Sequence, residues 1–196
     1  MKKYIAILAA VLLLAVGTVK ADDVRIETII SACSDMKSMK CDFTETKRVP
    51  LLEDEQFSKG YMLYVQPSRL KWAYTEPNTV SLGVDGETVT IDGTDVSGDG
   101  SRIFQGIAGV MLGCMSGQCL KDSRMFKVSM SDADGLWIAT MIPVRRDMKK
   151  MFQQIVLSFS SETGLLEKID MTETGGGNTV IEICNVQLNG NYEAEW

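Results

Sequence analysis

Apolar residues recur at helical spacing in one segment that follows the first twenty residues. The residues of this repeat are Val24, Ile26, Ile29, Ile30, Cys33 and Met36. A period near 3.6 predicts one amphipathic helix over residues 23–40. Asp22 and Asp23 precede the repeat and are suitable N-cap residues.

The hydrophobic period then changes to two, which is typical of strands with one buried face. It predicts strands over residues 41–49, 60–66, 70–74, 80–84, 87–91, 125–130, 136–142, 154–159, 165–172 and 179–188. Asp85-Gly86 and Asp134-Gly135 each separate two of these segments and favour tight hairpin turns. Another turn is predicted at Asp92-Gly93.

An apolar, glycine-rich segment interrupts the strands at residues 101–113. Its apolar side chains share one helical face, and they are Ile103, Phe104, Ile107, Val110 and Met111. Three glycines weaken this helix by ~1 kcal/mol each relative to alanine. The segment is therefore a candidate lid that can part from the sheet, and the alternative is a fixed helix that covers one end of a barrel.

A short helical turn is predicted over residues 145–151. The fold class is therefore mainly β with some α: a curved antiparallel sheet, or incomplete barrel, covered by helices. Neither an internal repeat nor a linker divides the sequence. We expect a single domain over residues 22–196.

The first residues have the pattern of a secretory signal peptide. Lys2 and Lys3 precede an unbroken apolar run over residues 5–16, and Val19-Lys20-Ala21 offers small residues at a cleavage site. The run is shorter than the ~20 residues that a membrane-spanning helix needs. We expect cleavage after Ala21, with export of residues 22–196 as a soluble protein, since no cysteine follows the site for lipid attachment.

Charge and composition exclude several classes of function. The net charge is −6, and removal of the lysines at positions 2, 3 and 20 makes it −9. Such an acidic chain is repelled by nucleic-acid phosphates, so no nucleic-acid partner is expected. The chain has no histidine, which removes His-based catalysis and His-ligated metal sites. We expect no enzyme, no cofactor and no metal.

A basic cluster stands out on this acidic chain, formed by Arg145, Arg146, Lys149 and Lys150. It is either a solvated turn or a contact for an acidic partner surface.

Five cysteines occur in a chain that is expected to reach an oxidising compartment. Cys114 and Cys119 bracket a short loop and are a candidate disulfide pair. A Cys33–Cys41 pair is a second possibility, and Cys184, within a strand pattern, is expected to be a buried thiol.

Two neighbouring predicted strands provide candidate walls for an apolar cavity. Their alternating residues are Met62, Tyr64, Gln66, Leu70, Trp72 and Tyr74. Acyl chains gain ~0.8 kcal/mol per buried methylene, so a cavity of this kind binds lipid without any catalytic group. The alternative is that these side chains are ordinary core.

The same residues resemble a known family. Phe43 to Lys47, Gly60 to Pro67, Leu70 to Pro77 and Val84 to Val89 together are similar to the outer-membrane lipoprotein carrier family, the LolA-like periplasmic chaperones. The pattern fixes three strands and their turns together. Outside residues 43–92 the likeness is one of element order only.

The resemblance implies a periplasmic half-barrel that binds the acyl chains of lipoproteins and carries them from the inner to the outer membrane. The implied partners are acylated lipoproteins, an inner-membrane lipoprotein-releasing ABC transporter and, for delivery, an outer-membrane acceptor, with the carrier expected to be a monomer. The alternative is an envelope sensor or another lipid-binding protein of the same fold. Many members have arginine before the proline, where it clasps the lid helices, and this chain has Gln66.

Overall fold

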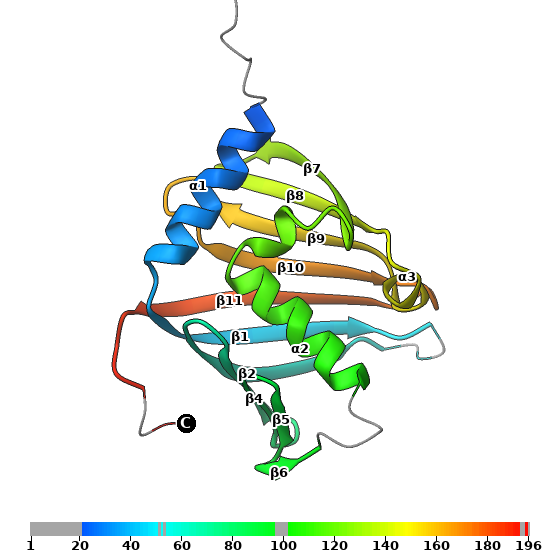
Figure 1. Cartoon of the computed structure of the whole chain (residues 1–196). Helices are drawn as coiled ribbons and strands as arrows, with labels where there is room; N and C mark the ends of the chain where they lie inside the picture. Colours follow the sequence, from blue (N-terminus) through cyan, green and yellow to red (C-terminus); the bar gives the residue numbers. More distant parts are fainter. Residues whose placement is uncertain (1–20, 51, 53, 97–101, 193–194, 196) are drawn as a thin grey trace, which may run out of the picture.

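The structure is a computed structural model, and it describes residues 21–50, 52, 54–96, 102–192 and 195 (Figure 1). The side chains of residues 21 and 102–108 are outside this description. The predicted signal peptide also lies outside the described residues, apart from Ala21, so it stays a prediction.

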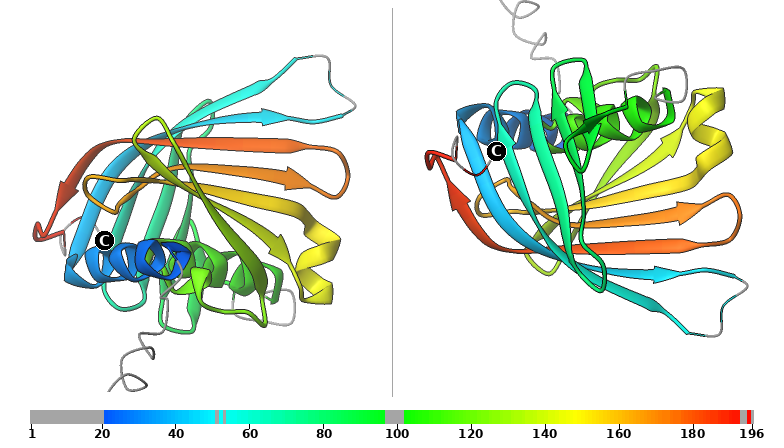
Figure 2. Two further views of the ribbon diagram at one scale, coloured as in Figure 1. Left: turned by 90° about the horizontal axis from the view of Figure 1, so that it is seen from above. Right: turned by 90° about the horizontal axis from the view of Figure 1, so that it is seen from below.

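Eleven strands form one curved antiparallel sheet, as the hydrophobic pattern predicts. Their order across the sheet is β6-β5-β4-β3-β2-β1-β11-β10-β9-β8-β7, and every neighbouring pair is antiparallel. The two edge strands, β6 and β7, do not pair with each other, so the sheet is an open half-barrel (Figure 2). The strands are β1 (Ser38–Arg48), β2 (Gln56–Val65), β3 (Arg69–Glu76), β4 (Val80–Asp85), β5 (Thr88–Ile91), β6 (Thr94–Asp95), β7 (Phe126–Ala133), β8 (Leu136–Pro143), β9 (Phe152–Ser160), β10 (Leu166–Glu173) and β11 (Asn178–Leu188).

The pairing of β1 with β11 joins the two halves of the chain. Strands β1–β6 follow one another along the sequence, and so do β7–β11, but β1 and β11 are neighbours only in space. Phe43 lies opposite Ile183 in this pair. The centre of the sheet is therefore built from a long-range contact between the start and the end of the described chain.

Two longer helices cover the concave side of the sheet. Figures 1 and 2 show α1 (Ala21–Asp35) and α2 (Arg102–Met115) on the same side of the sheet. The short α3 (Arg146–Met151) connects β8 to β9 at the ends of these two strands. A 3₁₀ turn over Gln118–Leu120 follows α2. Gly117, which has a positive φ of 69°, packs against Ile29 and Ile30 of α1.

The prediction of one helix over residues 23–40 is wrong at its C-terminal end. α1 ends at Asp35, and β1 begins at Ser38. Tertiary hydrogen bonds take the backbone groups of Lys37: its N–H donates to Asn189 Oδ1 (2.8 Å), and its carbonyl accepts from the N–H of Gln66 (3.0 Å). Met36, the last residue of the apolar repeat, is buried although it lies outside the helix, so its spacing alone was misleading.

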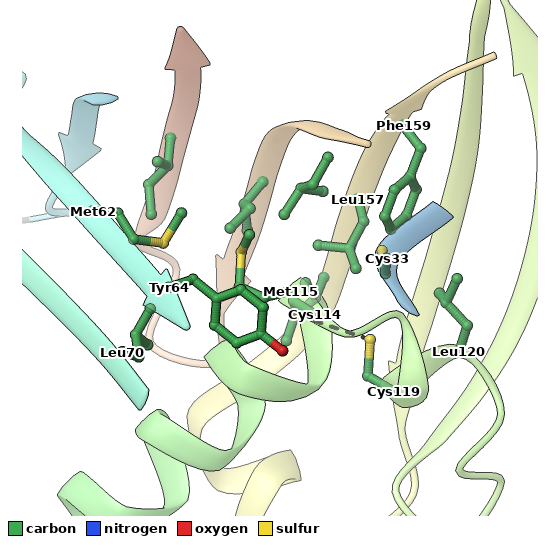
Figure 3. Close-up of a cluster of buried hydrophobic side chains, with 14 of the residues drawn as sticks. Cys33, Met62, Tyr64, Leu70, Cys114, Met115, Cys119, Leu120, Leu157 and Phe159 are labelled. Atoms are coloured by element: carbon green, nitrogen blue, oxygen red, sulfur yellow. Dashed lines mark hydrogen bonds between the residues drawn. The ribbon is translucent and has the colours of Figure 1, made fainter. Parts of the chain in front are cut away.

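The core fills the space between the concave face and the helices. Figure 3 shows Met62, Tyr64 and Leu70 in the same buried cluster as Cys114 and Met115 of α2. On the opposite face, residues after β11 pack against the sheet, where Lys71 Nζ donates to the carbonyl of Glu195 (2.8 Å). Among the described residues, none of the helices is both long and apolar enough to cross a membrane.

Candidate functional site

A cavity of about 640 Å³ lies between the concave face and the helices α2 and α3. Its volume is within the ~300–1,000 Å³ range of small-molecule sites. Strands from both halves of the sheet contribute to its wall. The lining residues are Glu45, Lys47, Trp72, Tyr74, Leu82, Val110, Met111, Cys114, Met148, Lys150, Met151, Phe152, Ile155, Ile169, Met171, Glu173, Gly175, Thr179 and Ile181.

Aromatic rings form one wall of the cavity. Trp72 stacks on Phe43 with ring centroids 4.2 Å apart, and Tyr74 meets the edge of Phe43 at 5.3 Å. Gly60 on β2 leaves the room for this group, because a Cβ there would lie 2.5 Å from Phe43 Cζ. The absence of a side chain at Gly60 therefore lets the three rings pack together. Their stacked and edge-to-face contacts are the arrangements that aromatic pairs favour.

One polar contact lies within this wall. The Tyr74 hydroxyl donates to Glu45 Oε2 at 2.8 Å. Burial, and then the neighbouring Glu45 carboxylate, raise the pKa of Tyr74 above its ordinary value. The phenol thus stays protonated and donates its hydrogen bond to the Glu45 carboxylate.

Charged side chains gather at the end of the cavity next to α3. Lys47 Nζ lies 3.4 Å from Glu173 Oε1, and Thr179 Oγ1 donates to the same oxygen at 3.3 Å. Lys150 and Gly175 are exposed there. The exposed and polar lining residues mark this end as the mouth, and the buried residues Ile155 and Ile181 mark the interior.

The candidate wall residues divide into two groups. Trp72 and Tyr74 line the cavity. Met62, Tyr64 and Leu70 are buried in the core and do not line it. These three side chains therefore lie behind the cavity wall, in the packed core.

The candidate lid residues also divide. Val110 and Met111 of α2 are half-buried and line the cavity. The side chains of Ile103, Phe104 and Ile107 lie outside the described part, so their role stays a prediction. α2 itself spans Arg102–Met115, close to the predicted 101–113.

Gln66 binds the end of α1 rather than the cavity. Its Nε2 donates to the carbonyl oxygens of Cys33 (2.9 Å) and Ser34 (3.1 Å). The last carbonyls of a helix have no partner within the helix, so these bonds satisfy them as a C-terminal cap. A glutamine amide thus fastens one of the covering helices to the sheet.

Cys114 and Cys119 are free thiols in the structure, with Sγ atoms 3.9 Å apart. A disulfide needs ~2.05 Å, so this bond is not formed here, and the pairing stays a prediction. The hydrogen bond between the two thiols, and burial, raise the pKa of Cys119. Burial also raises the pKa of the Cys33 thiol to about 11.

The expectation that Cys184 is buried is wrong. Cys184 is exposed, and Cys33 and Cys41 are free and buried. Cys184 lies opposite Asp42, next to a register irregularity between β1 and β11. The alternation of β11 therefore puts Ile181 and Ile183 toward the core and Cys184 on the opposite face.

The C-terminal strands form a wall of the cavity that the sequence pattern did not predict. Ile155, Ile169, Met171 and Ile181 line the cavity from β9, β10 and β11. Each is part of a period-two pattern, so the buried face of its strand was visible in the sequence. Only the β1–β11 pairing shows that this face meets the wall formed by Trp72.

Within the described chain, no three His, Cys, Asp or Glu side chains gather as a metal site.

Comparisons with known proteins place the chain. The family described as "Outer membrane lipoprotein carrier protein LolA" matches residues 34–196. An outer-membrane lipoprotein carrier protein of Methylibium petroleiphilum is 24% identical over 187 residues, which are 95% of this chain and 89% of the relative.

Solved structures with related folds have low sequence identity. A LolA superfamily protein from Nitrosomonas europaea is 9% identical with a TM-score of 0.42, over 85% of this chain and 94% of the other. MucB of Pseudomonas aeruginosa, solved with MucA, is 10% identical with a TM-score of 0.47; the match covers 89% of this chain and 59% of that one. Lipoprotein LppX of Mycobacterium tuberculosis is 14% identical with a TM-score of 0.46, over 86% and 96% of the two chains. By the family match, the chain belongs to the outer membrane lipoprotein carrier protein LolA family.

Proposed function

We propose that the protein is a periplasmic carrier that binds the acyl chains of lipoproteins in the cavity of its half-barrel. The observation that carries the proposal is the cavity itself, about 640 Å³ and lined mainly by apolar side chains. Membership of the lipoprotein carrier family supports the class of cargo. The carrier would receive lipoproteins from an inner-membrane ABC transporter and deliver them toward the outer membrane.

Binding in this cavity needs no chemical step. Each methylene that moves from water into the cavity contributes ~0.8 kcal/mol, so a partly inserted chain already supplies several kcal/mol. Thioethers of Met111, Met148 and Met171 line the cavity, and their flexible chains suit ligands of varied shape. We therefore propose a binding protein rather than an enzyme.

Release of cargo would require α2 to move. Val110 and Met111 face the cavity, whereas the neighbouring Gly109 is exposed with no atom within 4 Å of a Cβ built on it. The other end of the helix is anchored by the buried Cys114 and Met115. α2 would then swing about its C-terminal end, a motion of the lid type.

Displacement of a fluorescent fatty-acid probe by palmitate tests the cavity. Met171→Trp replaces a flexible thioether chain with a bulky indole ring in the cavity and should abolish probe binding. Thr172→Trp is the matched control, because successive residues of a strand point to opposite faces. Equal binding by both variants would place the ligand outside this cavity.

A second variant tests the lid. Met111→Glu puts a carboxylate where burial is costly, so the lid should favour an open position and probe binding should weaken at least tenfold. Met111→Leu, which keeps the apolar volume, should bind like the wild type. Unchanged binding in Met111→Glu would show that α2 does not cover the ligand.

A further inference from the structure

One cation of the cavity mouth has no carboxylate partner among the residues that the structure describes. Lys47 is paired with Glu173, and Glu45 accepts the Tyr74 hydroxyl. Lys150 lines the cavity and forms no ion pair with any residue that the structure describes. The two carboxylates of the lining thus already have partners, and the ammonium group of Lys150 remains available for a ligand.

Hydrogen bonds hold Lys150 at this position. Thr174, in the turn after β10, donates from its N–H to the carbonyl of Met151 (3.0 Å) and from its Oγ1 to the carbonyl of Lys149 (2.9 Å). These bonds fix the last turn of α3 against the β10–β11 turn. Met148 of the same helix is buried and also lines the cavity. The backbone of Lys150 is therefore built into the rim, although its side chain is exposed.

The basic cluster of the sequence is divided by this arrangement. Arg145 is paired with Asp147 within the cluster. Lys149 is exposed and does not line the cavity, whereas Lys150 does. Lys149 and Lys150 are therefore adjacent and exposed in one short helix, but only Lys150 lines the mouth of the cavity.

We propose that Lys150 recognises the headgroup of the bound amphiphile, and that the site selects acyl ligands whose heads carry acceptor oxygens next to the chain. This inference rests on the proposed acyl-binding function. The ammonium donates hydrogen bonds to a carboxylate, a phosphate or an ester carbonyl, and it repels a cationic head. The chain end lies inward among Ile155, Ile169 and Ile181, so the ligand has one orientation.

The experiment compares three ligands with the same chain length and different heads. Palmitate, methyl palmitate and hexadecyltrimethylammonium each displace the fluorescent fatty-acid probe from the mature protein at low salt. Wild type should bind palmitate most tightly and the ammonium compound most weakly. Lys150→Met keeps an apolar stem and should weaken palmitate about three- to fivefold, the range of a partly exposed ion pair, with methyl palmitate less affected.

Charge reversal and a matched control sharpen the result. Lys150→Glu should reverse the order, so that hexadecyltrimethylammonium binds more tightly than palmitate. Lys149→Glu changes the net charge by the same amount and should keep the wild-type order. If Lys149→Glu and Lys150→Glu have equal effects, or if wild type does not discriminate among the heads, the inference is overturned while acyl binding stands. If none of the three ligands displaces the probe from wild type, the proposed function itself fails.

Discussion

Trp72 stacks on Phe43 with ring centroids 4.2 Å apart and ring planes 29° apart. Trp72 therefore belongs to the hydrophobic core, through its contact with the buried Phe43, and also to the wall of the cavity. Replacing Trp72 with alanine should lower the free energy of unfolding by ~3–5 kcal/mol and should also abolish acyl binding. Urea denaturation and probe displacement measure the two effects.

Tyr74→Phe is the companion variant on the same strand. It keeps the ring in the cavity wall and removes only the hydroxyl that Glu45 accepts. Binding should persist, and stability should fall by about 1 kcal/mol, the net value of one hydrogen bond. Full acyl binding by Trp72→Ala would contradict the assignment of the aromatic wall to the ligand site.

Gly60 is a position where no side chain fits. A Cβ there would lie 2.1 Å from the carbonyl oxygen of Ala73 and 2.5 Å from Phe43 Cζ. Gly60→Ala should therefore lower the melting temperature and the free energy of unfolding by ~1–3 kcal/mol or more. Gly109→Ala should have the opposite sign, because that site is open and alanine favours a helix by ~1 kcal/mol. Equal stabilities of the two variants would contradict the packing at Gly60.

Gln66 fastens α1 through two hydrogen bonds to its last carbonyls. Gln66→Leu should cost about 1–2 kcal/mol and increase hydrogen exchange in the last turn of α1. Gln66→Glu should cost more, because a carboxylate has no N–H to donate and repels the carbonyl oxygens. Gln56, exposed at the start of β2, is the control, and Gln56→Leu should change stability by less than ~0.5 kcal/mol. Identical exchange rates in all three variants would show that the cap does not hold the helix.

The buried thiols predict a loss of stability in alkaline solution under reducing conditions. Burial raises the pKa of Cys33 to about 11, and the Cys41 pKa rises to about 12, chiefly through burial. The same thiols ionise near ~8.5 in the unfolded chain. Between about pH 9 and 11 the unfolded state therefore binds fewer protons than the folded state, so stability falls as pH rises. The stability that the buried, protonated thiols contribute is fully present below pH 8.

Cys33→Ala should reduce this slope of stability against pH, whatever its effect at neutral pH. Alkylation gives an independent measurement, because the thiolate is the reactive form. At pH 8, iodoacetamide should modify the exposed Cys184, and it should reach Cys33 and Cys41 only in urea. Rapid alkylation of Cys33 in the folded protein would contradict its burial.

Local patterns were sufficient for most of the fold. Alternation and Asp-Gly turns predicted ten of the eleven strands; β6 (Thr94–Asp95) is two residues long and too short to show a period. The end of α1 was mispredicted because the hydrogen bonds of Lys37 come from Asn189 and Gln66, which are distant in sequence.

The site was only half visible in the sequence for a similar reason. Trp72, Tyr74, Val110 and Met111 come from the segments that the pattern singled out, and all four line the cavity. The opposite wall depends on the β1–β11 pairing, which no local pattern specifies. Lys150 was visible only as one member of a basic cluster, and its place at the mouth depends on the hydrogen bonds of Thr174.

The most direct test of the carrier account is release of a lipoprotein from membranes. The mature protein is incubated with inner-membrane vesicles that contain its lipoprotein-releasing transporter and a triacylated lipoprotein, and the soluble fraction is analysed by size and by native mass spectrometry. A matched lipoprotein without its acylated cysteine is the control. The account predicts a soluble one-to-one complex with the acylated form alone, lost in Met171→Trp. A complex of equal affinity with the unacylated form, unaffected by Met171→Trp, would contradict it and favour a protein-binding envelope sensor.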